Sequence, residues 1–200
     1  MHLNFLPSDL AGYETCASKS KGCSKACLHS SGNPVFMSQK TLGRLNRTLF
    51  YFKERAKFLS MMTREIRNHE INCKKKNLKP VVRLNTTSDI MWENHKIFEL
   101  FPNVQFYDYT KHLDRAAAFA NGKLPSNYHL TFSRSENTSD ATVRDLLKRG
   151  VNVAVVYHKE LPETDFGGFE VINGDETDLR FADPMGKVVG LKYKPSAGEA

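Results

Sequence analysis

The fold is indicated first by one strongly apolar stretch, NVAVVY at residues 152–157, which predicts a buried, central β-strand. Further strands are predicted on both sides of it, at 81–85, 104–109, 128–132 and 188–193. Helical patterns lie between them, at 86–100, 113–121 and 140–149. Strands that alternate with helices at this spacing are typical of parallel βαβ units. The sequence therefore predicts an α/β fold, and periodicity leaves open whether its strands curve into a barrel.

The bulk composition predicts a soluble, cytoplasmic protein of one domain over residues 1–200. Forty per cent of the residues are apolar and 26% are charged, which is ordinary for a globular protein. No apolar run reaches the roughly 18 residues of a membrane-spanning helix, so no membrane partner is expected. The N-terminus lacks the basic and apolar regions of a signal peptide. We divide the domain into a loop region (1–37) that holds three of the four cysteines and is expected to bind a metal cluster, a basic helical segment (38–79), βα units (80–193) and a flexible tail (194–200).

Charge is concentrated in the first part of the chain. Residues 1–79 carry 15 Lys/Arg and 5 Asp/Glu, a net charge of +10, whereas residues 80–200 carry 14 and 17, a net charge of −3. A long helix expected over 39–70 bears many of these cations, among them Arg44, Arg47 and Lys53. Such a helix can dock on nucleic-acid phosphates, or it can be a solvated basic face.

Three cysteines form the most informative motif. Cys16, Cys23 and Cys27 follow the spacing C-x6-C-x3-C in the stretch CASKSKGCSKACLHSSG, with His29 two residues later. Soft thiolates select iron–sulfur clusters or zinc. The long first gap and the absence of a second knuckle favour a cluster, with 4Fe-4S the expected type. Zinc completed by His29 and structural thiols remain as alternatives.

The fourth ligand of such a centre is not fixed by the sequence. It is an open position, His29, or Cys73, and Cys73 is the weakest of these because it lies in a lysine-rich segment at the end of the long helix. The three lysines between the first cysteines would offset the negative charge of a thiolate-bound cluster.

Polar residues gather after the predicted strands. In parallel α/β folds, ligands bind at the carboxyl ends of strands, although many such Ser, Thr, Asp and Asn residues serve only as helix caps. A Lys in the second loop and a Glu in the third are not caps, and they suit an anionic or zwitterionic small ligand. The candidate ligand-binding residues are Asn85, Ser88, Asp89, Asp108, Tyr109, Lys111, Ser133, Ser135, Glu136, His158, Asp175 and Asp178.

Several segments across about residues 5–193 form a recognisable set: AGYETC, SKGCSKACLHSSG, RLNRTLFYF, VVRLNTTSDIMWE, VQFYDYTK, NYHLTFSRSEN, GVNVAVVY and GDETDLRFADP. Together they resemble a phage protein family, the gene product eighty-eight family. The resemblance implies Cys16, Cys23 and Cys27 as metal ligands. It implies only a site, without a reaction, for the strand-end residues and for Asp183.

The predicted architecture is also similar to that of radical SAM enzymes, in which a three-cysteine loop precedes βα units of a partial barrel. That resemblance implies that the strands form a partial or distorted (β/α) barrel. It also implies S-adenosylmethionine as a further cofactor. The N-terminal cysteine-rich loop and the long basic helix of this expected fold come from the sequence itself. The spacing departs from the C-x3-C-x2-C of those enzymes, and no glycine-rich motif for that cofactor is evident.

We therefore expect a phage iron–sulfur protein of the infected cell's cytoplasm, with a small-ligand or radical-SAM-like site at the strand ends. Whether it is an enzyme is left open. The alternatives are a nucleic-acid-associated protein with a structural or redox-sensing metal centre, and a simple electron carrier.

Overall fold

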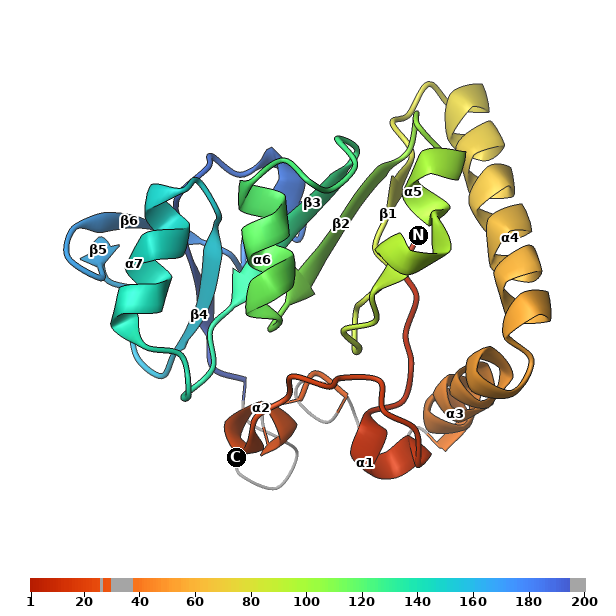
Figure 1. Cartoon of the computed structure of the whole chain (residues 1–200), viewed down its shortest axis with the longest axis horizontal. Coiled ribbons are helices and arrows are strands. Elements are labelled where there is room, and N and C mark those ends of the chain that lie inside the picture. Colours follow the sequence, from red (N-terminus) through yellow and green to blue (C-terminus); the bar gives the residue numbers. More distant parts are fainter. Residues whose placement is uncertain (26, 30–37, 195–200) are drawn as a thin grey trace.

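A computed structural model of the chain describes residues 1–25, 27–29 and 38–194. Its centre is a sheet with the strand order β1-β2-β3-β4-β7-β6-β5 (Figure 1). Neighbouring strands run parallel except β5, which is antiparallel to β6. The strands are β1 (Val81–Val82), β2 (Gln105–Thr110), β3 (Tyr128–Ser133), β4 (Val153–Tyr157), β5 (Thr164–Asp165), β6 (Phe169–Asn173) and β7 (Val188–Lys192). The predicted α/β class is confirmed.

The N-terminal segment extends the sheet beyond β1. His2 forms a parallel bridge with Arg83, and Leu3 N donates to Arg83 O at 2.9 Å. The sheet thus ends at the N-terminal segment on one side and at β5 on the other, so it does not close into a barrel.

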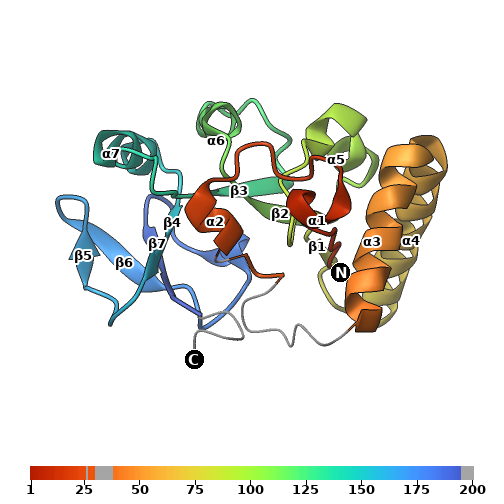
Figure 2. The ribbon, with the colours of Figure 1, turned by 90° about the horizontal axis from the view of Figure 1, so that it is seen from below.

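Three helices cover one face of the sheet (Figure 2). They are α5 (Ile97–Leu100), α6 (Leu113–Ala120) and α7 (Asp140–Lys148). The helix expected over 86–100 is shorter, because Lys96 takes a left-handed conformation (φ 53°) between the 3-10 turn η1 (Trp92–His95) and α5. Two apolar clusters fill the space beneath the helices, one around Trp92 and Phe98 and the other around Phe132 and Val153.

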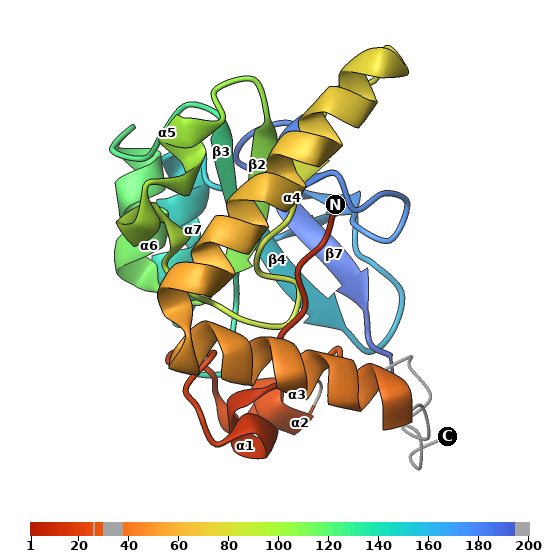
Figure 3. The ribbon, with the colours of Figure 1, turned by 90° about the vertical axis from the view of Figure 1, so that its right-hand side faces the viewer.

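The long helix expected over 39–70 is two helices, α3 (Ser38–Lys53) and α4 (Arg55–Lys75), which meet at Glu54 (Figure 3). The bend lets Tyr51 and Phe58 pack on the same ring, that of Phe5. In α3 the leucine stripe is not the buried face, since Leu42 is 49% exposed. The buried residues of α3 are Arg44, Thr48 and Tyr51.

The pair β5–β6 was not predicted. The glycines at 167 and 168, both with positive φ, indicate only a turn, and the structure shows that this turn joins two short antiparallel strands. A second 3-10 turn, η2 (Arg180–Ala182), precedes β7.

The N-terminal loop with its short helices α1 (Ser8–Ala11) and α2 (Lys21–Lys25) lies across the carboxyl ends of the parallel strands (Figures 1 and 2). Residues 26 and 30–37 of the predicted loop region, and 195–200 of the predicted tail, lie outside the described residues. Within the described ranges, no helix has the length and apolar character needed to cross a membrane.

Candidate functional site

The cysteine loop is held to the ends of three successive βα segments by hydrogen bonds. After β1, Cys16 Sγ donates to Thr87 O at 3.8 Å and Asp89 N donates to Thr15 O at 2.8 Å. After β2, His112 Nδ1 lies 2.9 Å from Ser18 Oγ. The loop is therefore docked on the strand ends, where parallel α/β folds place their ligands.

The contact after β3 is made by Glu136. Its carboxylate accepts from Ser20 Oγ at 2.6 Å and from Gly22 N at 2.8 Å. These two bonds lower the pKa of Glu136 to about 2, so it is ionised at neutral pH. A Cβ at Gly22 would lie 2.8 Å from Glu136 Oε2, so glycine lets the loop backbone approach the carboxylate this closely.

Cys16, Cys23 and Cys27 are all half-buried, and none is in a disulfide. Burial raises the pKa of the Cys16 thiol to about 12, and the negative charges of Asp89, Cys27 and Cys23 contribute to this rise. Burial likewise raises the pKa of Cys27, with a contribution from Cys23. The three thiols therefore lie close enough to repel one another electrostatically when ionised.

The chemistry of this donor set fits a soft metal centre, because a bound cation would remove the repulsion between the thiolates. As the chain is arranged here, no three Cys, His, Asp or Glu side chains of the described residues are already placed to hold a metal ion.

His29 and Cys73 were candidates for the fourth ligand. Arg44 Nη1 lies 2.7 Å from His29 Nδ1, and a guanidinium can only donate, so His29 Nδ1 is the acceptor. The neutral ring then carries its proton on Nε2, which disfavours metal binding through that atom. Cys73 lies beside His69, which in turn contacts Val81 O at the start of β1. The cysteine loop crosses the other end of the strands, so Cys73 is remote from it.

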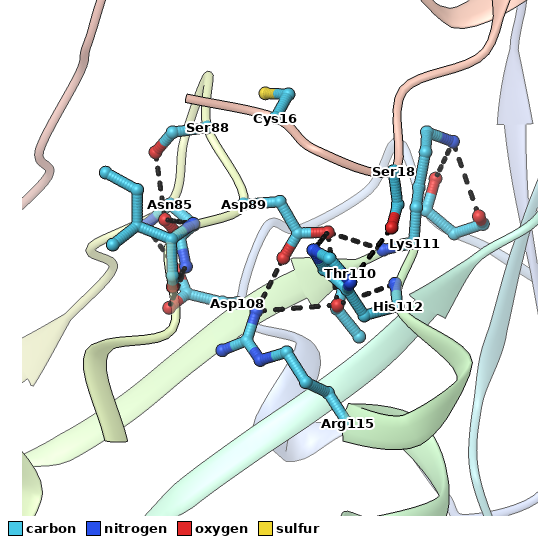
Figure 4. A network of polar contacts seen from close by, with 12 residues as sticks. Cys16, Ser18, Asn85, Ser88, Asp89, Asp108, Thr110, Lys111, His112 and Arg115 are labelled. Atoms are coloured by element: carbon cyan, nitrogen blue, oxygen red, sulfur yellow. Dashed lines mark hydrogen bonds and ion pairs between the residues drawn. The ribbon is translucent and has the colours of Figure 1, made fainter. Parts of the chain in front are cut away.

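Asp89 connects the first two strand-end loops (Figure 4). Its Oδ2 accepts from Lys111 N at 2.7 Å and from Thr110 Oγ1 at 3.1 Å. Its Oδ1 accepts from Arg115 Nη1 at 2.5 Å. Arg115 is 3% exposed and also forms an ion pair with Glu93. Both oxygens of Asp89 are thus used within the protein, which gives this residue a bracing role.

Asn85, Ser88 and Asp108 form a separate buried network. Asp108 is 1% exposed and accepts from Asn85 N at 2.6 Å and Tyr128 Oη at 3.1 Å. Asn85 Oδ1 accepts from Ser88 Oγ, and also from Trp92 Nε1. Burial raises the pKa of Asp108 to about 7. These three predicted ligand residues therefore fix the loop after β1 from the interior of the protein.

Lys111 and Ser133 meet at the ends of β2 and β3. Lys111 Nζ donates to Ser133 Oγ at 2.9 Å and to Ser133 O at 3.3 Å. Ser135 Oγ lies 3.2 Å from Thr138 Oγ1, within the turn before α7. Among the predicted strand-end residues, Asp89 and Glu136 bond the loop directly, through Thr15 O and through Ser20 and Gly22. Lys111 precedes His112, which contacts Ser18 of the loop.

The remaining candidates lie elsewhere. Asp178 pairs with Arg83, whose guanidinium lies 4.8 Å from the centre of the Tyr109 ring. Asp175 pairs with Lys194, and the His158 ring packs 4.5 Å from that of Tyr193.

The three cations predicted to bind nucleic acid lie in different surroundings. Arg44 is only 6% exposed and its guanidinium contacts His29. Arg47 donates to Asn4 O at 2.7 Å. Lys53 is exposed at the end of α3. The three cations therefore do not form one continuous phosphate-binding surface.

Several residues that were not among the predicted site residues position the loop: Ser18, Ser20, Thr87, His112 and Arg115. Arg44, predicted for nucleic acid, also contacts the loop, at His29. The best available signal was Arg115, a lone cation in the otherwise apolar run RAAAFA, since a buried cation needs carboxylate partners.

Fold and site together define a mixed α/β protein with a cysteine-rich loop docked across the carboxyl ends of parallel strands. The chain belongs to the Gene product 88 family, whose model matches residues 3–199. The comparisons with curated proteins and with solved structures found no match. The family indicated by the sequence motifs is confirmed, and the similarity to radical SAM enzymes stays a hypothesis.

Proposed function

We propose that the protein binds an iron–sulfur cluster through Cys16, Cys23 and Cys27 and uses it at a small-ligand site on the carboxyl ends of the strands. The observation that carries this proposal is the docking of the cysteine loop on three successive strand-end segments, through Thr87, His112 and Glu136. A structural zinc site needs no particular position in the fold, since it can stabilise a loop anywhere on the protein. A loop placed across the ligand-binding edge of a parallel sheet suggests a reactive centre.

Three protein thiolates leave one iron of a 4Fe-4S cluster without a protein ligand. The hydrogen bond from Arg44 to His29 Nδ1 supports an open fourth position, because it leaves the proton on Nε2. When bound, such a cluster supplies an electron or a Lewis-acidic iron to a ligand at that position.

The chain's own residues would orient the ligand. Lys111 presents an ammonium group at the end of β2, where it contacts Ser133. This cation suits a carboxylate or phosphate of the ligand. Glu136 would act indirectly, as a positioning residue, because its carboxylate is bonded to Ser20 and Gly22 of the loop.

The finer form of the proposal is a partial barrel of the radical SAM type, with S-adenosylmethionine as the molecule that takes the open iron. Six parallel strands with a three-cysteine loop at their carboxyl ends support it. The C-x6-C-x3-C spacing counts against it. We also propose that the protein acts in the cytoplasm of the infected cell.

The test is anaerobic purification or reconstitution, with iron and sulfide analysis and EPR spectroscopy of the reduced protein. Cys16→Ala, Cys23→Ala and Cys27→Ala are each expected to lose the cluster. Cys73→Ala, a matched control remote from the loop, should retain it. The reduced protein is then titrated with S-adenosylmethionine.

A change in the EPR spectrum on this addition would support the radical-SAM-like form. An unchanged spectrum would leave the cluster proposal in place and remove this cofactor. Zinc without sulfide, or a cluster that survives all three loop substitutions, would overturn the proposal.

A further inference from the structure

A groove of about 370 Å³ lies beside the cysteine loop, on the side that faces α3 and α4. Three chain segments form it: residues 14–17, the helix junction at 51–55, and the segment at 89–95. This volume is in the range of small-molecule sites and is too small for a folded partner. Its main lining residues are Ala17, Phe52, Arg55, Met91, Asn94 and His95.

The walls of the groove are held in place by contacts behind them. The Phe52 ring stacks on Tyr13 at 4.7 Å. Tyr51 is buried, and its hydroxyl lies 3.1 Å from His95 Nε2. A groove whose walls are already fixed loses little conformational entropy when a ligand binds.

The lining of the groove combines apolar and polar side chains. Ile90 and Met91 provide an apolar surface, and Met91 is 38% exposed. A methionine side chain adapts its shape to a flat ligand. Asn94 is exposed next to them, and its amide offers both a donor and an acceptor.

The lining has three charged side chains, Glu14, Asp89 and Arg55. The oxygens of both carboxylates are used within the protein: those of Glu14 accept from Cys16 N and Lys19 Nζ, and those of Asp89 accept from Lys111 N and Arg115 Nη1. Arg55 is exposed, with its guanidinium 4.6 Å from the centre of the Tyr51 ring, and it has no salt bridge in the described part of the chain. Burial lowers the pKa of His95, so this ring is neutral near pH 7. Among the described lining residues, Arg55 is therefore the charged side chain left for a ligand, and it suits an anionic group.

We infer that this groove binds a nucleotide. The phosphate contacts Arg55, whose planar guanidinium matches phosphate geometry, and the base lies on Ile90 and Met91 with its polar edge at Asn94. A single small molecule with both a flat heterocycle and an anionic group satisfies the size, the apolar surface and the lining cation that has no salt bridge within the described residues. The site goes beyond the proposed cluster and does not depend on it, since its lining contains none of the three cysteines.

The experiment uses Trp92, the one tryptophan of the sequence, as a reporter. Its ring lies 5.3 Å from Tyr51 and 5.8 Å from His95, so changes in the groove walls alter its surroundings. The full-length protein is titrated with adenosine monophosphate, adenosine, inorganic phosphate and a short single-stranded oligonucleotide. Calorimetry repeats each titration without depending on fluorescence.

Adenosine monophosphate is expected to saturate and to bind more tightly than adenosine or phosphate. Arg55→Gln should weaken it about tenfold, the size of one lost charge-assisted contact. The control Arg64→Gln, an exposed position on the same helix and outside the groove, should not change it. If the oligonucleotide binds more tightly per nucleotide, the ligand of the groove is a nucleic-acid strand. If the monophosphate binds more tightly, the ligand is a free nucleotide.

Absence of saturable binding by both methods, or equal affinity in Arg55→Gln and the unaltered protein, would overturn the inference. Adenosine monophosphate binding is also measured in Cys16→Ala. If this variant binds adenosine monophosphate but no iron, the groove works without the cluster. The nucleotide proposal and the cluster proposal can therefore each fail without the other.

Discussion

Arg44 Nη1 of α3 lies 2.7 Å from Nδ1 of His29, so a cation predicted to face solvent points into the cysteine loop. The same guanidinium lowers the pKa of Cys27, against the larger effect of burial. Helix α3 is thereby fastened to the loop at its third cysteine. This contact joins the basic helix to the candidate metal site.

We expect Arg44→Ala to lower the free energy of unfolding by about 2 kcal/mol, because it removes a buried cation and leaves His29 without its donor. Arg47→Ala, the exposed neighbour whose bond goes to Asn4 O, should cost less than about 1 kcal/mol. Urea unfolding of the two variants measures the difference. Equal effects would show that the Arg44–His29 contact does not stabilise the protein.

Glu136→Ala should release the cysteine loop from the end of β3, because both loop bonds of the carboxylate are lost. The loop contains Lys19, Lys21 and Lys25, so limited trypsin digestion reports its exposure. We expect faster cleavage in this loop than in the unaltered protein. Glu160→Ala, at an exposed position outside residues 1–37, serves as the control and should digest like the unaltered chain. An unchanged cleavage rate in Glu136→Ala would argue against this anchor.

Arg115→Met should be severely destabilising, by about 3–5 kcal/mol, because it leaves Asp89 and Glu93 without their buried partner. Arg134→Met removes a partly exposed ion pair with Asp140 and should cost about 1 kcal/mol or less. Thermal unfolding of both variants compares them. Similar melting temperatures would contradict the bracing role assigned to Arg115 and Asp89.

The strands β2, β3, β4 and β7 could be predicted within one or two residues because their apolar runs are local signals. The hairpin β5–β6 could not, since two glycines and polar residues interrupt it. The bend at Glu54 depends on where Tyr51 and Phe58 find a common partner in Phe5, which is a tertiary contact. Helix periodicity alone carries no information about such a contact.

For the candidate site, the sequence predicts which residues lie at the same edge of the sheet but not which of them are bonded within the protein. Parallel topology places the loops after the strands at one edge, so Lys111, Ser133 and Glu136 could be grouped from the sequence. What the sequence could not reveal is which carboxylates the protein uses internally. Asp89 is occupied because Arg115, one helix away, reaches it, and no spacing rule indicates this pair.

His129 should make the protein acid-sensitive. Burial lowers the pKa of His129 from 6.5 to about 4, and the charge of Arg180 contributes. The unfolded chain takes up this proton below pH 6.5 and the folded chain only near pH 4. Stability is therefore full above about pH 6.5 and falls as the pH drops towards 4, by roughly 3 kcal/mol at most. Urea unfolding across this range should show the loss, and His129→Gln should reduce it. A variant with the same pH dependence would exclude His129 as its source.

Asp108 should act in the opposite direction over an overlapping range. Burial raises the pKa of its carboxyl from 3.8 to about 7, against the opposing effects of the bond from Asn85 and the charges of Arg83 and Arg115. The folded chain therefore keeps this proton to a higher pH than the unfolded chain. The contribution of Asp108 to stability is full below pH 3.8 and falls as the pH rises to 7, by about 4 kcal/mol at most.

Asp108→Asn is the variant that isolates this effect, because an amide keeps the shape of the side chain without titrating. The free energy of unfolding of Asp108→Asn, relative to the unaltered protein, should rise between pH 4 and 7 and level off above 7. We expect the variant to lose a constant amount of stability at all pH values, since one oxygen that accepts from Asn85 or Tyr128 is replaced by an NH₂ donor. The slope against pH, and not the absolute stability, is therefore the quantity that tests the prediction. A difference that stays constant from pH 4 to 7 would mean that Asp108 is ionised in the folded protein throughout, despite its burial.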